Sequence, residues 1–227
     1  MIVYSIITDY RYLEDILNYQ NTLTYDNKVN YVILTNKSHL KSYENEKITI
    51  KFIDDHISDF EFSRKYKFGI YTFFIDEPIL YCDSTIQISN KNIIKLCSFL
   101  NSNPHPILWF KHNKRKNGFQ EAVYCFMVGK IKFSIILKYL YYSIATNCKS
   151  SLAQGGIFII NSNKSKNELE TWKSLFYKIG GKRDQLSLSL LKNKKSVILK
   201  EITKINFLRN QYEIKGIRKY LYNIFKR

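Results

Sequence analysis

Proline, glycine and long apolar runs are scarce in this sequence. Of its 227 residues, 3 are proline and 8 are glycine, so no stretch has the composition of a long flexible linker. No apolar run approaches the roughly 18 residues that a membrane-spanning helix needs. Met1 leads directly into an apolar segment without a basic region or a cleavage site, so we expect no secretory signal peptide.

Cysteine is also sparse, and its spacing argues against a zinc site. The four cysteines are Cys82, Cys97, Cys125 and Cys148. No two of them are close in sequence, and no histidine follows at the spacing of a metal ligand. Scattered cysteines in apolar surroundings are typical of a reducing compartment, so we expect a cytoplasmic protein.

Acidic residues are too few to balance the basic ones. There are 36 Lys and Arg against 19 Asp and Glu, which gives a formal net charge of +17. This excess predicts a polyanionic partner, namely nucleic acid, an anionic membrane or phosphorylated small molecules. Part of this excess positive charge also reflects a general bias of the sequence toward Lys, Asn, Ile and Tyr, and needs no partner to explain it. The length and the 45% of hydrophobic residues indicate one globular core.

Apolar periodicity predicts an α/β protein. Runs at residues 2–8, 29–35 and 48–53 indicate buried strands, and helical spacing over residues 11–22 places a helix between the first two. A strand–helix–strand unit predicts a parallel sheet. Further strands are expected at 79–82, at 107–110, after Gly155-Gly156 and at 197–202, and further helices at 60–74, 89–100, 119–145, 166–178 and 184–192.

The C-terminal residues have a different pattern from the rest. Apolar side chains fall on one helical face over residues 211–227, with Lys and Arg around it. We therefore expect a globular domain over residues 1–210, followed by a basic amphipathic helix over 211–227 that lies on an anionic membrane. Packing of this helix against the domain is the alternative.

Three polar residues could bind a nucleotide diphosphate. Asp83 directly follows the strand at 79–82, and α/β sheets bind ligands at the carboxyl ends of their strands. A carboxylate there can hold a divalent cation or a sugar hydroxyl; a solvent-facing turn is the alternative. Arg64 and Lys67 lie one helical turn apart and could bind phosphate oxygens, or could form an ordinary solvated helix face.

A second group follows the strand at 107–110. His112 and Arg115 lie just past its end, and Glu121 comes shortly after them. An imidazole, a cation and a carboxylate together could serve an acceptor or a leaving group. The alternative is a polar loop followed by a glutamate that begins a helix.

Two further motifs carry candidate residues. Asp184, followed by Gln185, is expected at a helix N-terminus, where it is either the N-cap or a general base that positions an acceptor hydroxyl. Gly155 and Gly156 either let a substrate approach the backbone closely or mark a bulge in a strand.

The order of these motifs resembles the GT-A-like glycosyltransferase family of plant mucilage-synthesis proteins and bacterial surface-polysaccharide gene clusters. The matching segments, within residues 1–190, are Ser63–Lys67, Leu80–Ile86, His112–Arg115 with Glu121, Gly155–Ile157, and Trp172 with Arg183–Ser187. The resemblance implies one Rossmann-like GT-A domain with a mixed, mostly parallel central sheet flanked by helices. It implies transfer of a sugar from a nucleotide-sugar donor to a surface glycan or lipid-linked acceptor at the cytoplasmic membrane face.

The resemblance also implies roles for individual residues. The catalytic residues would be Asp184, Glu121 and His112. The residues that bind the donor would be Thr8, Asp9, Tyr10, Arg64, Lys67, Asp83, Arg115, Gly155, Gly156 and Gln185.

The sequence departs from other GT-A enzymes at the expected metal site. Those enzymes carry a second carboxylate two residues after the first, and here that position is Thr85. A Mn or Mg ion would therefore depend on Asp83 and the donor diphosphate, or basic side chains would replace it. No histidine follows His112 in the chain, so a C-terminal histidine ligand is absent.

Two other functions fit the composition. Loss of the second carboxylate is compatible with a catalytically inactive, glycosyltransferase-like binding protein. The charge permits a nucleic-acid-binding module, but the sequence has no recognisable nucleic-acid motif, so nucleic acid is not the expected partner.

Overall fold

A computed structural model describes most of the chain. The described residues are 2–20, 29–73, 78–84, 86–87, 96, 106–112, 115–146, 152–160, 165–191, 196–197 and 206–207. The expected helix at 89–100 (except residue 96), most of the expected strand at 197–202, and the basic helix at 211–227 lie outside the described residues.

The main sheet has seven strands in the order β3-β2-β1-β4-β7-β6-β8. Their bounds are β1 Ile2–Ile6, β2 Asn30–Thr35, β3 Ile48–Phe52, β4 Ile79–Cys82, β6 Ile107–Lys111, β7 Ala153–Ile160 and β8 Ser196–Val197. Strand β1 pairs in parallel with β2 and β4, β2 with β3, and β6 with β8, whereas β4 and β7 are antiparallel. A smaller antiparallel pair joins β5 (Ile86–Gln87) to β9 (Asn206–Phe207).

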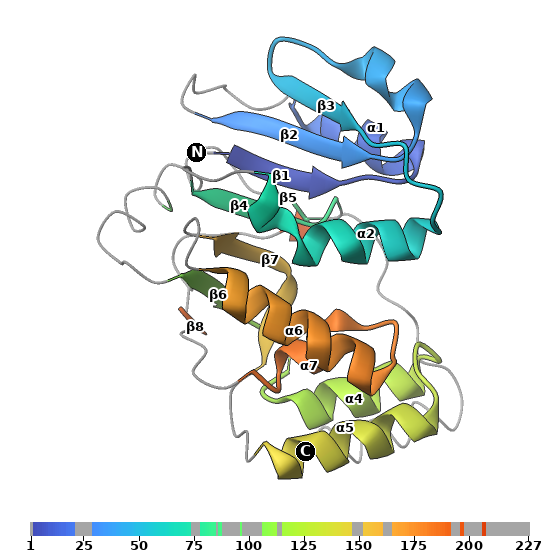
Figure 1. Ribbon diagram of the computed structural model, residues 1–227, viewed down its shortest axis with the longest axis vertical. Helices are drawn as coiled ribbons and strands as arrows, with labels where there is room; N and C mark the ends of the chain where they lie inside the picture. Colours follow the sequence, from blue (N-terminus) through green and yellow to red (C-terminus); the bar gives the residue numbers. More distant parts are fainter. Residues whose placement is uncertain are drawn as a thin grey trace. The chain divides into compact units, whose positions relative to one another are not determined.

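Helices follow most of the strands (Figure 1). Their bounds are α1 Tyr10–Gln20, α2 Asp59–Phe68, α4 Gly118–Met127, α5 Phe133–Ala145, α6 Lys166–Ile179 and α7 Asp184–Leu188, with the 3-10 turns η1 Ser38–Tyr43 and η2 Ile70–Thr72. The mixed, mostly parallel sheet with flanking helices confirms the predicted fold class. No helix among the described residues is both long and apolar enough to cross a membrane.

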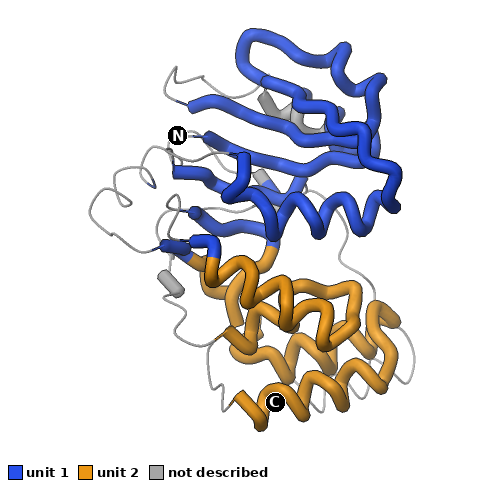
Figure 2. The backbone as a smooth tube through the Cα atoms, viewed as in Figure 1, with its two compact units in different colours: residues 1–108, 156–166, 199–209 blue, residues 109–155, 167–198, 210–227 orange. Residues whose placement is uncertain are grey.

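The chain divides into two compact units (Figure 2). Unit 1 comprises residues 1–108, 156–166 and 199–209, and unit 2 comprises residues 109–155, 167–198 and 210–227. Two of the boundaries between the units fall inside strands. The chain passes from one unit to the other between Leu108 and Trp109 in β6, and between Gly155 and Gly156 in β7.

Unit 1 is an open sheet with helices on both faces. On one face, α1 and η1 pack on β2 and β3 in a core formed by Ile7, Leu13, Ile33, Leu40, Ile48 and Ile50. In Figure 1, α1 lies behind these strands and α2 lies in front. Strand β1 is flanked by β2 on one side and β4 on the other, so the strand order reverses at β1. Such a reversal leaves a crevice at the carboxyl ends of the two neighbouring strands.

Helix α2 has defined signals at both ends. Ser58 and Glu61 form a capping box, in which each side chain accepts a hydrogen bond from the other residue's backbone N–H. The helix ends at Gly69, whose N–H donates to the Lys65 carbonyl, so it is shorter than the predicted 60–74. Hydrogen bonds from Lys65 and Tyr66 hold the pKa of Asp55 below its usual value, and they fix the loop that precedes the helix.

Unit 2 contains two helices where the sequence predicted one helical stretch at 119–145. Helix α4 ends at Met127, and α5 begins at Phe133. Gly129 lies between them with φ 73°, a left-handed conformation that favours glycine and ends a helix. The two helices pack with α7 around a core of Ala122, Cys125, Ile131, Ile136, Tyr139, Ile179, Leu186 and Leu190.

Candidate functional site

The carboxyl ends of β1 and β4 lie at one edge of unit 1. Because the two strands are parallel and adjacent, the residues that follow them leave the sheet at the same edge. Thr8, Asp9 and Tyr10 follow β1, and Asp83 follows β4. The Ser5 hydroxyl donates to the Cys82 carbonyl at 2.7 Å, which joins the two strands just before this edge.

Asp9 and Tyr10 occupy the start of α1. The Asp9 carboxylate accepts hydrogen bonds from the backbone N–H of Arg11 at 3.0 Å and from its guanidinium, so it caps the helix and is paired with a cation. The Tyr10 ring is 39% exposed and lies 5.2 Å from the Tyr43 ring, centroid to centroid. An exposed aromatic ring at the carboxyl edge of a sheet offers a surface on which a planar base could stack.

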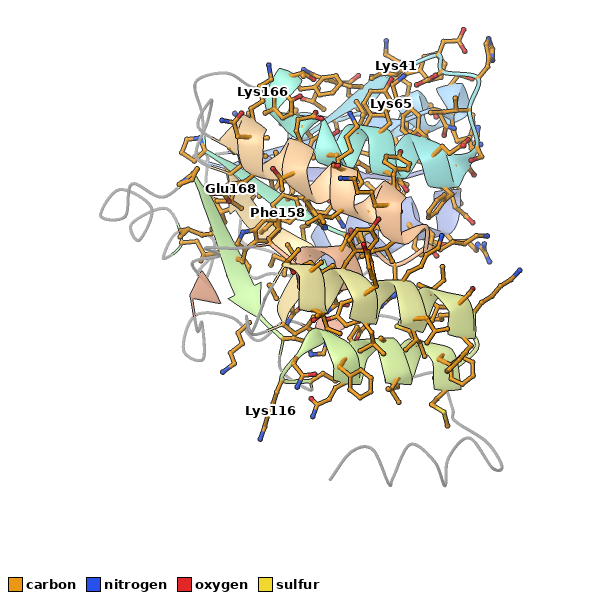
Figure 3. All side chains as sticks on the ribbon, turned by 60° about the horizontal axis from the view of Figure 1, so that its bottom comes forward. Lys41, Lys65, Lys116, Phe158, Lys166 and Glu168 are labelled. Carbon is orange, nitrogen blue, oxygen red and sulfur yellow. The ribbon has the colours of Figure 1, made fainter. Side chains whose placement is uncertain are left out.

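Asp83 lies in a cluster with Lys67 and Tyr81, which we call the Asp83 cluster. Its Oδ1 accepts a hydrogen bond from the Tyr81 hydroxyl at 2.7 Å and another from the Lys67 ammonium at 3.3 Å. The ammonium also lies 4.7 Å from the centroid of the Tyr81 ring, within the range of a cation–π contact. The Tyr81 ring stacks on Phe158 of β7, which is labelled in Figure 3.

Gly156 packs directly against Asp83. The backbone N–H of Asp83 donates to the Gly156 carbonyl at 2.7 Å. A Cβ atom at Gly156 would lie only 2.6 Å from Asp83 Oδ2, whereas a Cβ atom at Gly155 would lie 3.4 Å from Asp184 Oδ1. The second distance is an ordinary contact, so only Gly156 needs to be glycine for lack of space.

This difference predicts the effects of two matched substitutions. Gly156→Ala should displace the Asp83 carboxylate and lower the free energy of unfolding by about 1–3 kcal/mol through overpacking. Gly155→Ala should change it by less than about 1 kcal/mol, since its Cβ would make only ordinary van der Waals contacts, the nearest at 3.4 Å. Chemical denaturation of both variants measures the two effects. Equal stabilities for the variants would contradict the packing of Gly156 against Asp83.

Arg64 and Lys67 differ in their surroundings although they lie on one helix. The Lys67 side chain is 1% exposed and faces Asp83, whereas Arg64 is half-buried with its guanidinium carbon 5.3 Å from the centroid of the Phe60 ring. The structure therefore brings Lys67 into contact with Asp83.

The Asp83 cluster does not fit a divalent cation. Such an ion needs several oxygen ligands, usually including more than one carboxylate when it is bound tightly. Oδ1 of Asp83 already accepts from an ammonium and a phenol. No group of three or more His, Cys, Asp or Glu side chains suited to a metal occurs among the residues described by the structure.

In unit 2, Glu121 joins two arginines; we call Glu121, Arg115, Arg183 and Cys125 the Glu121 cluster. Glu121 is fully buried. Its Oε2 accepts from Arg115 Nε, and its Oε1 accepts from Arg183 Nη2 at 3.4 Å and from the Cys125 thiol at 3.2 Å. Burial raises the pKa of Cys125 to about 12, with a further contribution from the Glu121 charge. The carboxylate thus fixes both guanidinium groups, which favours a positioning role for Glu121.

His112 contacts Arg115 through both of its ring nitrogens. The backbone N–H of Arg115 donates to His112 Nδ1 at 3.0 Å, and Arg115 Nη2 lies 3.1 Å from His112 Nε2. A neutral imidazole accepts at only one of its two ring nitrogens, so the tautomer of His112 decides the role of each nitrogen in these contacts. The backbone of His112 donates to the Leu152 carbonyl at 2.9 Å, which holds the histidine beside β7.

Asp184 and Gln185 begin α7 beside the first residues of β7. Asp184 is the first residue of the helix, and the N-cap position belongs to Arg183. The Trp172 indole donates to the Asp184 carbonyl at 3.0 Å, and the Gln185 amide donates to the Ala153 carbonyl at 3.3 Å. Both residues are nearly buried, so their positions are fixed by these contacts.

The structure thus groups most of the predicted residues, and it adds others. Lys67, Asp83 and Gly156 come together in unit 1; His112, Arg115 and Glu121 come together in unit 2, as do Gly155, Asp184 and Gln185. Sequence reasoning gave no role to Cys125 and only a motif position to Tyr81 and Arg183. Tyr81 lies two residues before Asp83 in a strand, and the period of two places both side chains on one face, which is a signal that could have identified it.

Comparison with solved structures shows which class of fold this is. The fold is the GT-A-like, Rossmann-type fold of glycosyltransferases. One match is the galactosyltransferase LgtC in complex with donor and acceptor sugar analogues, with a TM-score of 0.52 and 12% identity over 84% of this chain and 70% of LgtC. An active-site mutant of LgtC, in which a glutamine is replaced by glutamate, matches with a TM-score of 0.52 and 11% identity over 84% of this chain and 69% of that one.

Similarity at this level of identity shows the fold. No protein-family model matches the chain, and no curated protein matches it.

Proposed function

We propose that this chain is a glycosyltransferase that takes a sugar from a nucleotide-sugar donor. The observation that carries the proposal is the Asp83 cluster at the carboxyl edge of β1 and β4, in a fold shared with LgtC. This edge is where open α/β sheets bind ligands. LgtC was solved with donor and acceptor sugar analogues, which supports the same two classes of ligand here.

Unit 1 supplies the donor side of this proposal. The exposed ring of Tyr10 stacks on the base, and the Thr8–Asp9 turn contacts the nucleoside. Asp83, whose side chain is 41% exposed, accepts hydrogen bonds from donor hydroxyls. Arg64 binds the diphosphate, because guanidinium groups match phosphate oxygens in pairs of hydrogen bonds.

For the transfer step we propose roles for residues that follow β6 and for residues that begin α7. Arg115, fixed by Glu121, stabilises the negative charge that develops on the departing diphosphate. Asp184 accepts the proton of the acceptor hydroxyl or positions that hydroxyl for attack. Glu121 and His112 act on Arg115, since both contact it directly. Gln185 fixes the start of α7 on β7 and thereby the position of Asp184.

Binding and turnover of a panel of nucleotide sugars test this proposal. We expect one class among UDP, GDP, CMP and TDP sugars to raise the melting temperature, because ligands that bind only the folded state stabilise it. The same donor should then release its nucleotide in the presence of an acceptor. Stabilisation by no member of the panel would contradict the proposal. Stabilisation without release would favour the inactive binding protein, the second candidate that the Thr85 position suggests.

We place the activity at the cytoplasmic face of a membrane, with a glycan or lipid-linked acceptor. An exposed apolar stripe on α5 supports this location: Phe133, Leu137, Tyr141 and Ile144 are 57%, 52%, 68% and 79% exposed and recur at helical spacing. Exposed Lys132 and Lys138 accompany the stripe, and lysines favour anionic lipid surfaces.

Flotation with vesicles tests the membrane location. The double variant Leu137→Ser/Ile144→Ser should bind vesicles of anionic lipid about tenfold more weakly than the unmodified protein, because it loses apolar area that inserts between lipids. Tyr177→Ser, which removes an exposed aromatic ring from α6, is the matched control and should bind as before. Equal binding of all three proteins would contradict a membrane role for α5.

A further inference from the structure

Lys67 gives the Asp83 cluster a buried positive charge. Its side chain is 1% exposed, and its ammonium lies 3.3 Å from Asp83 Oδ1. Lys65, two residues earlier on the same helix and labelled in Figure 3, is 56% exposed and pairs with Asp55. Burial of an ammonium is costly unless a carboxylate and hydrogen bonds compensate for lost water. The fold therefore maintains a costly charge at this position, where an exposed lysine would be easier to accommodate.

This ammonium occupies the oxygen that a metal ion would use. A divalent cation binds a carboxylate oxygen at roughly 2.0–2.6 Å, so an ion on Asp83 Oδ1, which is 3.3 Å from the Lys67 ammonium, would lie within roughly 6 Å of that charge. Two positive centres at that separation repel each other. The second oxygen, Oδ2, lies against Gly156, where even a methyl group would be only 2.6 Å away.

Asp83 paired with Lys67 is a different kind of group from an unpaired carboxylate. An unpaired carboxylate repels a diphosphate, and a bound metal ion removes that repulsion. In the Asp83 cluster, the ammonium neutralises the carboxylate within the protein. The part of Asp83 that remains exposed can then accept hydrogen bonds from donor hydroxyls close to an anionic diphosphate.

We infer that the nucleotide-sugar site of this chain works without a divalent cation, because the Lys67 ammonium supplies the positive charge at Asp83. The inference rests on the proposed function for the identity of the ligand, and on the contacts of the Asp83 cluster for the exclusion of the ion. On this inference Lys67 is a positioning residue that acts through Asp83, since the Lys67 side chain itself is buried.

The first test measures manganese binding by the nucleotide-free protein. Electron paramagnetic resonance of free Mn²⁺ should show no uptake that differs between the unmodified protein and Asp83→Asn. Lys67→Glu, which places a second carboxylate beside Asp83, should increase Mn²⁺ affinity about tenfold or more. Uptake of Mn²⁺ by the unmodified protein that is lost in Asp83→Asn would overturn the inference. The comparison of these two proteins decides the question even if Lys67→Glu does not fold.

The second test measures the affinity for nucleoside diphosphates, with UDP, GDP, CDP and TDP as probes. The probe that binds should have the same dissociation constant, within about twofold, in excess EDTA and in Mn²⁺. Lys67→Met should weaken its binding about tenfold, since Asp83 would then be an unpaired carboxylate that repels the diphosphate. Lys67→Arg should weaken it less, and Lys65→Met is the matched control that should not change it.

The outcomes of the second test separate the two proposals. Binding that requires Mn²⁺ would overturn the metal-independent site while supporting a nucleotide site. Binding of no probe in either condition would contradict the proposed function, and the manganese measurement would still decide whether Asp83 holds a metal ion.

Discussion

Glu121→Gln is expected to lower the free energy of unfolding by about 3–5 kcal/mol. The substitution removes one negative charge from a fully buried side chain and leaves Arg115 and Arg183 close together without it. Removal of one partner from a buried ion pair has effects of this size, because the remaining charge stays away from water. For a chain of about this length, a loss of 3 kcal/mol lowers the melting temperature by about 6–12 °C.

Matched variants test the source of this effect. Glu170→Gln breaks a surface pair with Lys173, in which both side chains are more than 40% exposed, and it should cost less than about 1 kcal/mol. Arg183→Met combined with Glu121→Gln should cost less than the sum of the two single changes, because the residues share one contact. Additive effects, or a loss no larger than that of Glu170→Gln, would contradict the role assigned to Glu121.

Asp184→Asn is expected to reduce sugar transfer by about 10²-fold to 10⁴-fold, the range that general base catalysis contributes. Asparagine keeps the size of the side chain and suits the start of a helix, so the melting temperature should change little. The rate of nucleotide release with the donor found in the panel is the measurement. Asp54→Asn, an exposed position, is the control.

Two other results at Asp184 would have distinct meanings. A raised KM for the acceptor with unchanged kcat would indicate that Asp184 contributes to binding only. Transfer at the unmodified rate would remove Asp184 from the site.

The strands of unit 1 could be predicted because they are continuous apolar runs bounded by polar residues. The expected strands at 2–8, 29–35 and 48–53 correspond to β1, β2 and β3 within a few residues. The prediction of a parallel βαβ unit is confirmed by the pairing of β1 with β2. In these segments local pattern and tertiary burial agree, so the sequence signal is sufficient.

Long-range contacts determined the features that the sequence did not predict. The strand after Gly155-Gly156 begins earlier, at Ala153, and its antiparallel pairing with β4 depends on residues some 80 positions away. The apolar stretch at 119–145 masked the break at Gly129, although a glycine followed by a lysine was a visible signal.

The candidate site shows the same division between local and distant information. Asp83 could be located from its strand, because a polar residue after a buried run lies at the edge of a sheet. The burial of Lys67 could not be predicted, since a lysine on a helix is ordinarily solvated and its partner Asp83 is 16 residues away. The role of Glu121 depends on Arg183, 62 residues later in the chain.

The contact between Gly156 and Asp83 also restricts how β7 can change during evolution. The register pairs Cys82 with Ile157, so an inserted or deleted residue in this strand would bring a neighbour to the position of Gly156. A shift in one direction brings Gly155 there and leaves room for the carboxylate. A shift in the other direction brings the branched side chain of Ile157 against it. At this position, the paired glycines therefore make a register shift in one direction less damaging than a shift in the other.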